Sequence, residues 1–191
     1  MLRRASARAR GHGGVVARQR RSLAPMSDWF RTYGFAEVHD GLTIGAYPLD
    51  ADDVRMLAAM SVRRVLNLVE DQEYGPGRRY VVEAALREAR IEEHRMQLTD
   101  FGRLPPEPLE EAVRTVVSWL KAGVPSYVHC RAGWQRSAAV AAGAVAVYVG
   151  LGIDEAVAYV QERKPSADPL PHQRDDLRAW WNARSHLHPS R

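Results

Sequence analysis

The most informative stretch of the sequence is 127–137, which reads YVHCRAGWQRS. It begins inside a short apolar run, 125–129, that has the length of a strand, and it ends where a helix rich in small residues is predicted to begin. In α/β sheets ligands bind at the carboxyl ends of the strands, and a loop that leads into a helix presents convergent backbone N–H groups and the positive end of the helix dipole. The sequence therefore predicts an anion-binding loop that opens at Cys130 and closes at Arg136.

Two side chains of this loop carry reactive chemistry. A cysteine thiolate at the base of a cradle of N–H groups has a lowered pKa and can attack phosphorus in line, forming a covalent intermediate. Arg136 lies six positions after Cys130, which leaves enough chain for the loop to turn back so that both side chains face one anion. The planar guanidinium can bind two phosphate oxygens and stabilise their charge in the transition state. The pair indicates phosphate-ester chemistry.

The remaining residues of the loop are expected to support this pair. Gly133 allows the backbone to approach the phosphate oxygens closely. Ser137 can hydrogen-bond the sulfur and help it leave in the second step, and it can also cap the following helix. We expect His129 to orient the loop through hydrogen bonds and not to transfer protons. The backbone that cradles the phosphate belongs to Arg131, Ala132, Gly133, Trp134, Gln135 and Arg136.

The rest of the chain alternates strand patterns with helix patterns. Strands are predicted on both sides of the Asp40-Gly41 turn within 38–48, and at 64–70, 91–98 and 125–129. Helices are predicted at 51–60 behind an Asp50 cap, at 78–90, from 109 to a stop at Gly123, at 137–150, at 154–163 and around Leu177. A proline-rich loop occupies 99–108. The alternation predicts an α/β fold with a mostly parallel central sheet flanked by helices.

The stretch at 127–137 resembles the signature of the cysteine-dependent protein tyrosine phosphatase superfamily, which is His-Cys, five residues, then Arg followed by Ser or Thr. The resemblance is greatest to the dual-specificity branch and extends from Ala36 to Trp181, through the segments LTIGAYP, RVLNLVE and PSYVHC. It implies that Cys130 is the nucleophile and Arg136 the phosphate-binding arginine. It also implies a dual-specificity-phosphatase-like fold and a phosphocysteine intermediate, with no metal or organic cofactor.

The resemblance further implies an aspartic acid about thirty residues before the cysteine. Asp100 lies 30 residues before Cys130, at the start of the proline-rich loop, and is the expected general acid. It would protonate the leaving oxygen and then take a proton from the attacking water. Asp71, Glu73 and Glu107 are alternative carboxylates on loops, and Asp100 could instead cap a turn.

Three residues of the loop leave the substrate class open. The pair Trp134-Gln135 is similar to the Phe-Asn pair of RNA 5′-triphosphatases, and Arg131 is similar to the basic residue found there in lipid phosphatases. The expected function is a dual-specificity protein phosphatase that acts on phosphotyrosine and phosphoserine/threonine. The alternatives are a lipid phosphatase acting on phosphoinositides or phosphatidylglycerophosphate, an RNA 5′-phosphatase, or a catalytically inactive phospho-binding module.

The composition of the chain limits the classes of protein to which it can belong. The chain has 191 residues, 46% of them apolar and 26% charged, which is ordinary for a globular domain. Its single cysteine excludes an internal disulfide and a cysteine-based structural zinc site. Seven of its 27 basic residues lie within 1–25, a segment without acids, so the remainder holds 20 basic and 23 acidic residues. The net charge of +4 therefore belongs to the tail, and we do not expect a nucleic-acid partner on charge alone.

We expect three regions: a disordered or targeting tail at 1–25, a phosphatase domain at 26–185 and a flexible C-terminus at 186–191. The tail is rich in Arg, Ala and Gly, with a few serines and no acids, so it is either a transit peptide or a disordered or mis-called start before Met26. The expected location is the cytoplasm, or the mitochondrial or plastid matrix if the tail is a transit peptide. The longest uncharged run, 137–153, has 17 residues and fits a core helix better than a transmembrane segment.

Overall fold

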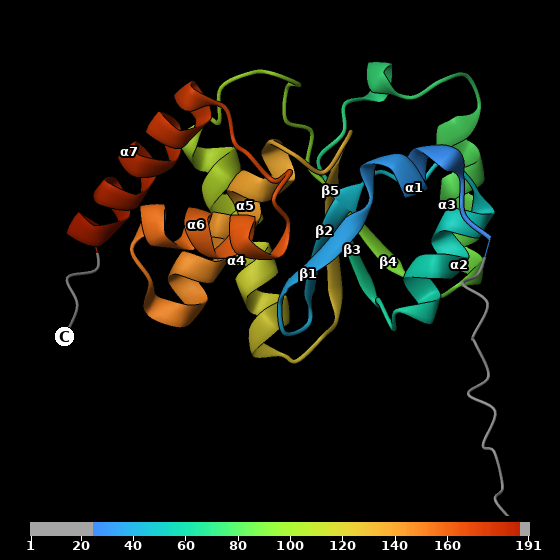
Figure 1. Ribbon diagram of the computed structural model, residues 1–191, viewed down its shortest axis with the longest axis horizontal. Helices are drawn as coiled ribbons and strands as arrows, with labels where there is room; N and C mark the ends of the chain where they lie inside the picture. The colour runs from blue at the N-terminus through green and yellow to red at the C-terminus, as the bar shows by residue number, and fades with distance from the viewer. Residues whose placement is uncertain (1–24, 188–191) are drawn as a thin grey trace, which may run out of the picture.

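The computed structural model describes residues 25–187, with side chains through Arg184. Its centre is a five-stranded sheet in the order β1-β2-β5-β3-β4 (Figure 1). The strands are β1 (Phe35–His39), β2 (Leu42–Ala46), β3 (Arg64–Asn67), β4 (Glu92–Arg95) and β5 (Ser126–Cys130). β1 pairs antiparallel with β2, and every other pairing is parallel. The mostly parallel sheet predicted from the sequence is therefore confirmed.

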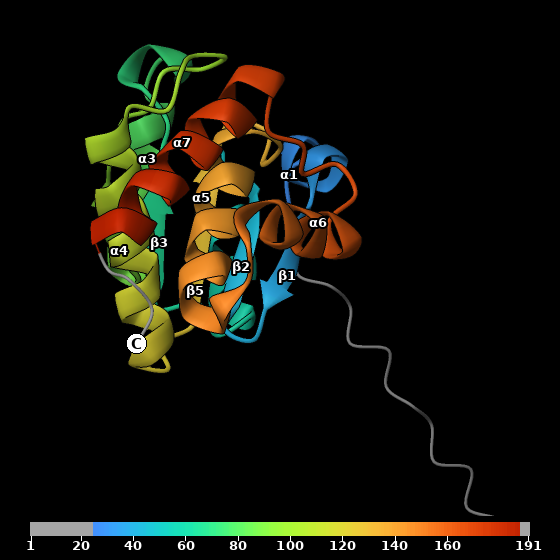
Figure 2. The same cartoon turned by 90° about the vertical axis from the view of Figure 1, so that its left-hand side faces the viewer.

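Helices cover both faces of the sheet. One face carries α1 (Asp28–Tyr33), α2 (Ala51–Ala59) and α3 (Arg78–Glu88), and the other carries α4 (Pro106–Lys121), α5 (Arg136–Val145) and α6 (Ile153–Arg163) (Figures 1 and 2). The last helix, α7 (Pro171–Leu187), packs on α4, α5 and α6 as an outer layer. These are the flanking helices that the alternating pattern predicts.

The core explains the uncharged run of the sequence. Every residue of α5 is buried, because this helix lies between the sheet and the helices α4, α6 and α7. A helix that is apolar on all sides is stable only when it is covered on all sides. Among the described residues, no single helix is long and apolar enough to cross a membrane. The segments Arg136–Gly150 and Ile153–Arg163 reach the required length and hydropathy only as a pair, and the chain bends by 114° between them.

Most predicted elements are present, with bounds that differ by a few residues. The Asp50 carboxylate caps α2 as predicted, accepting from the N–H groups of Asp52 and Asp53 at 3.0 Å each. β3 ends three residues earlier than predicted because the side chain of Asn67 accepts from the N–H of Val69 at 2.9 Å and turns the chain. α4 begins inside the predicted loop, at Pro106, where a proline costs no helical hydrogen bond.

Two short elements were not predicted. One is α1, and the other is the 3₁₀-helix η1 (Asp71–Glu73) after β3. The helix predicted at 137–150 is α5 followed by a π-helical turn, η2 (Ala146–Gly150). The tail predicted at 1–25 lies outside the described residues except for Pro25, and the expected domain limits stay a prediction.

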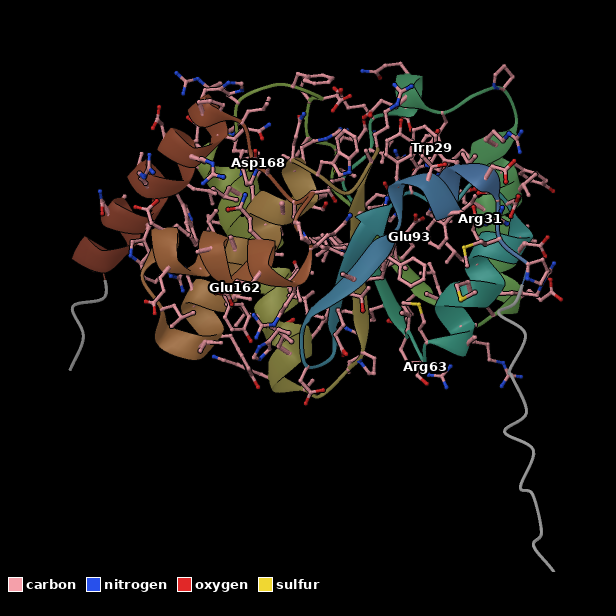
Figure 3. The ribbon with its side chains drawn as sticks, viewed as in Figure 1. Trp29, Arg31, Arg63, Glu93, Glu162 and Asp168 are labelled. Carbon is pink, nitrogen blue, oxygen red and sulfur yellow. The ribbon has the colours of Figure 1, made fainter. Side chains whose placement is uncertain are left out.

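The parallel strands β2, β3, β4 and β5 end at one edge of the sheet, the upper edge in Figure 1. Trp29 of α1 and Asp168 of the α6–α7 connection lie toward this edge, whereas Arg63 lies at the opposite one (Figure 3). Because ligands bind at the carboxyl ends of parallel strands, this edge is the expected place for a site.

Candidate active site

The loop between β5 and α5 lies at the carboxyl edge of the sheet. β5 ends at Cys130 and α5 begins at Arg136, as the sequence pattern predicts. Two backbone hydrogen bonds join the loop to neighbouring segments of the chain. The N–H of Tyr47 donates to the carbonyl of Arg131 at 3.2 Å, and the N–H of Asp168 donates to the carbonyl of Trp134 at 2.7 Å. The loop is thereby tied to the end of β2 and to the α6–α7 connection.

Glycine at position 133 has a structural cause in this loop. Gly133 has a φ of +74°, a left-handed conformation that L side chains rarely adopt. A Cβ built there would come within 2.4–2.6 Å of the backbone of Gly45 in β2. The loop therefore packs directly on the sheet backbone, and any side chain at 133 would push it away from Cys130.

The thiol of Cys130 lies at the base of a cradle of amides. Burial alone would raise its pKa, but the positive charge of Arg136, the Ser137 hydroxyl and the backbone N–H groups of Ser137 and Gln135 outweigh burial, so the pKa of the thiol is lowered. The Sγ atom is 3.4 Å from the Ser137 hydroxyl oxygen. When the sulfur is a thiolate, the hydroxyl is the donor in this hydrogen bond.

Arg136 is the first residue of α5 and is completely buried. Its Nη1 and Nη2 atoms donate to the two carboxylate oxygens of Glu73 at 2.6 and 2.8 Å, a bidentate ion pair. Nη1 also donates to the carbonyl of Leu98 at 2.8 Å. The Nε–H of Arg136 is buried and has no hydrogen-bond partner among residues 25–187. Buried donors are normally paired, so this N–H is free to bind an oxygen of an anion in the site.

Asp100 lies on the loop after β4, next to Arg136. Its Oδ1 atom is 2.8 Å from Nη2 of Arg136, and its side chain is 23% exposed. The loop is held in place by Asp176 of α7, which accepts from the side chain of Arg103 at 2.7 Å and from the N–H of Leu104 at 2.9 Å. The carboxylate therefore borders both the arginine and the solvent, the position that a group exchanging protons with a substrate and with water requires.

His129 is buried beneath the loop and makes a hydrogen bond with the backbone of Cys130. Burial lowers the pKa of its imidazole to about 3. The ring is therefore neutral at physiological pH. This agrees with the expectation that His129 orients the loop and does not transfer protons.

The structure brings together all the side chains singled out in the sequence for catalysis: Cys130, Arg136, Asp100 and Ser137. Of the alternative carboxylates, Glu73 pairs with Arg136, whereas Asp71 pairs with Arg95 at the surface. The role of Glu73 was not predicted. A Glu on a loop gives no signal of its own, because only the folded chain places it against the arginine.

A pocket of about 220 Å³ opens above the sulfur. Its wall includes Trp29 and Tyr33 of α1, and no sequence pattern predicted these two residues at the site. The rest of the wall and the floor come from Asp100, Phe101, Cys130, Arg131, Ala132, Trp134 and Gln135. Within the described residues, no group of three or more His, Cys, Asp or Glu side chains could hold a metal ion.

The fold is similar to that of solved phosphatases. A mutant form of Tk-PTP superposes with a TM-score of 0.69 at 24% identity, covering 79% of this chain and 97% of Tk-PTP. PTPMT1 in complex with PI(5)P gives 0.70 at 21% identity over 80% and 97% of the two chains. Human DUSP28 gives 0.62 at 22% identity over 79% and 95%.

The sequence itself matches no protein-family model and no protein of curated function. The likeness is therefore one of fold, and it spans about four fifths of this chain and nearly the whole of each of these three structures. The five-stranded sheet and its flanking helices are shared, as the resemblance at the cysteine loop implied. This chain has the fold of the cysteine-dependent protein tyrosine phosphatases in the form found in dual-specificity phosphatases.

Proposed function

We propose that this protein is a phosphatase that hydrolyses phosphomonoesters through a phosphocysteine intermediate, with phosphotyrosine and phosphoserine/threonine proteins as substrates. The observation that carries the proposal is the Cys130 thiol. Its pKa is lowered by Arg136, by Ser137 and by two backbone N–H groups although the sulfur is buried. A thiolate in a cradle of donors is suited to attack a tetrahedral anion held by those same donors.

In the first step, the sulfur forms a bond to phosphorus and the bond from phosphorus to the ester oxygen breaks. Asp100 gives its proton to the leaving oxygen. Arg136 binds two phosphate oxygens through its unpaired Nε–H and through the Nη2–H that faces Asp100, which Asp100 gives up to the phosphate. Because the Glu73 carboxylate fixes the other edge of the guanidinium, the fork is oriented before the substrate arrives.

In the second step, water attacks phosphorus and gives a proton to Asp100. The bond between sulfur and phosphorus breaks, and inorganic phosphate is released. The Ser137 hydroxyl, 3.4 Å from Sγ, donates a hydrogen bond to the departing thiolate and makes it a better leaving group.

The test uses the fact that Cys130 is the single cysteine of the chain. We expect the wild-type protein to release phosphate from p-nitrophenyl phosphate and from phosphopeptides, whereas Cys130→Ser releases none and still binds vanadate. Iodoacetate should add one carboxymethyl group at neutral pH, and inorganic phosphate should protect against it. Full activity in Cys130→Ser, or no activity in the wild-type protein on any phosphomonoester, would contradict the proposal.

A second candidate substrate is a phospholipid headgroup. It is supported by the fold similarity to PTPMT1, which has been solved with PI(5)P bound. Arg131, which lines the pocket, is exposed and forms no ion pair with any described residue, so its charge is available to a second anionic group. Phosphate release from a phosphotyrosine peptide, a phosphoinositide, phosphatidylglycerophosphate and triphosphorylated RNA in one buffer separates these substrate classes.

A further inference from the structure

The pocket above Cys130 is small and has aromatic walls. Its volume of about 220 Å³ lies below the roughly 300 Å³ at which pockets begin to enclose drug-sized ligands. Four aromatic side chains line it: Trp29, Tyr33, Phe101 and Trp134. They come from α1, from the loop that carries Asp100 and from the cysteine loop. Since the sulfur lies in the same pocket, the group bonded to the phosphate must lie among these rings.

The rings are packed against one another before any substrate binds. The ring centroids of Trp29 and Tyr33 are 4.2 Å apart, and those of Tyr33 and Trp134 are 5.2 Å apart, both in tilted arrangements. Aromatic pairs favour offset or tilted contacts at such separations. Trp134 is nevertheless 41% exposed and Phe101 is 65% exposed. Both residues therefore keep much of their apolar surface exposed while they line the pocket.

Helix α1 is held at both ends by buried charged side chains. At its start, Asp53 of α2, which is 0% exposed, accepts from the N–H and the hydroxyl of Ser27 at 2.8 and 2.7 Å. At its end, Nζ of Lys164, which is 6% exposed, donates to the carbonyl of Tyr33 at 3.2 Å and to Ser166 at 2.8 Å. Neither charge has an ion-pair partner among the described residues.

Such charges are costly to bury without a partner of opposite sign. Burial raises the pKa of Asp53 and lowers the pKa of Lys164, so in both cases it works against the charged form. A helix of six residues cannot be stable by itself, because its nucleation cost exceeds what so few hydrogen bonds return. The two buried charges supply the hydrogen bonds that fix α1, and with it Trp29 and Tyr33, beside the cysteine.

We propose that α1 is the substrate-selecting wall of the site, that it favours phosphate esters of an aryl group over those of an alkyl group, and that Asp53 and Lys164 are positioning residues that hold it. This proposal rests on the phosphatase function proposed above. An aryl ester places a flat ring among Trp29, Tyr33 and Trp134, whereas an alkyl ester leaves those faces in contact with water.

The first experiment removes ring faces from the wall. Trp29→Ala and Tyr33→Ala are compared with the wild-type protein on two peptides that differ only in phosphotyrosine or phosphoserine. We expect kcat/KM for the phosphotyrosine peptide to fall by about five- to tenfold, mainly through KM, because ring contacts of this kind are lost. For the phosphoserine peptide, kcat/KM should change less than twofold. Tyr80→Ala, which removes an exposed aromatic residue of α3, is the matched control and should change neither value.

The second experiment tests the positioning role of Lys164. Lys164→Met removes the ammonium group and keeps the length of the side chain, and Lys164→Arg restores a donor. In folded protein, Lys164→Met should raise KM for the phosphotyrosine peptide with little change in kcat, and Lys164→Arg should restore it. A folded Lys164→Met with the wild-type ratio of the two peptide activities would show that Lys164 supports only the fold.

A third measurement needs no variant and therefore does not depend on the folding of one. Phenylphosphonate and methylphosphonate are compared as inhibitors of the wild-type protein, and we expect the aryl compound to bind at least about fivefold more tightly. Equal inhibition, together with an unchanged peptide ratio in Trp29→Ala, would overturn the aryl selectivity while leaving the phosphatase function intact. A wild-type protein that releases no phosphate from either peptide would instead contradict the function itself.

Discussion

At the scale of single residues, the proposed role of Asp100 as general acid depends on where its carboxylate lies. Its carboxylate is 2.8 Å from Arg136 and partly open to solvent. We expect Asp100→Asn to lower kcat by roughly 10²–10⁴-fold with normal folding, as loss of a general acid does. The loss in kcat/KM, which reports the first step, should be larger for phenyl phosphate than for p-nitrophenyl phosphate, because the nitrophenolate needs less protonation as it leaves.

The control for Asp100 is Glu107→Gln, which changes another carboxylate near the same loop, in the first turn of α4. We expect that variant to keep the wild-type kcat for both esters. Steady-state kinetics on the two substrates measures the difference. A near-native rate in Asp100→Asn, or an equal loss of kcat/KM on both esters, would move the acid to another group.

His129 gives the fold a dependence on pH. Burial lowers its folded-state pKa to about 3, below the ordinary value of 6.5, so the unfolded chain binds a proton that the folded chain does not. Between these two values this residue's contribution to stability is lost as the pH falls. We expect the loss from this residue to begin near pH 6.5 and to approach about 1.4 kcal/mol per pH unit roughly one unit below it.

Urea unfolding at several pH values between about 7.5 and 5 measures this slope, above the range where most carboxylates titrate. His129→Gln should flatten the slope, whatever its effect on stability at pH 7.5. His94→Gln, which changes an exposed histidine of β4, should leave the slope as it is in the wild-type protein. Equal slopes in the wild-type protein and His129→Gln would mean that the imidazole gains access to protons in the folded state.

At the scale of elements, the 3₁₀-helix η1 matters because it carries Glu73. The Glu73 carboxylate binds both Nη atoms of the buried Arg136. Removing one partner of a buried ion pair leaves the other uncompensated, so we expect Glu73→Ala to lower the free energy of unfolding by about 3–5 kcal/mol. It should also raise KM for phosphate esters, since the guanidinium loses its fixed orientation.

The same helix provides the matched control for Glu73. Asp71 pairs with Arg95 at the surface, with a side chain that is mostly exposed. Asp71→Ala should leave the free energy of unfolding close to the wild-type value, because exposed ion pairs contribute little to stability. Denaturant unfolding and KM are measured for both variants. Equal effects would mean that η1 acts as a whole and that the Glu73 carboxylate has no special part.

The elements also show what sequence patterns can and cannot predict. The strand before Cys130 and the helix after Arg136 follow from local sequence patterns, and the family resemblance, through its spacing to the cysteine, implied Asp100. Helix α1 was missed although Ser27 caps it and Gly34 ends it, because six residues give too little periodicity. Asp53, Glu73 and Lys164 could not be assigned, because their partners lie 26, 63 and 131 positions away in the chain.

At the scale of the whole molecule, α5 joins the cysteine loop to the outer helices. It begins at Arg136, and its Gly143 lies against Val113 of α4 and Trp180 of α7. A Cβ at Gly143 would come within 2.7 Å of the side chain of Val113 in α4 and within 3.4 Å of the ring of Trp180 in α7. The absence of a side chain at this position therefore lets three helices pack together behind the site.

We expect Gly143→Val to lower the free energy of unfolding by about 1–3 kcal/mol, because the added methyl groups overpack a filled core. The better helix propensity of valine offsets only a few tenths of a kcal/mol of that loss. Gly152→Ser is the control, since position 152 caps α6 and a Cβ there meets no atom within 4 Å. Urea unfolding with an unchanged m-value reports the difference as stability alone. If Gly143→Val is as stable as the wild-type protein, the outer helices can move apart without cost, and α5 does not couple them to the cysteine loop.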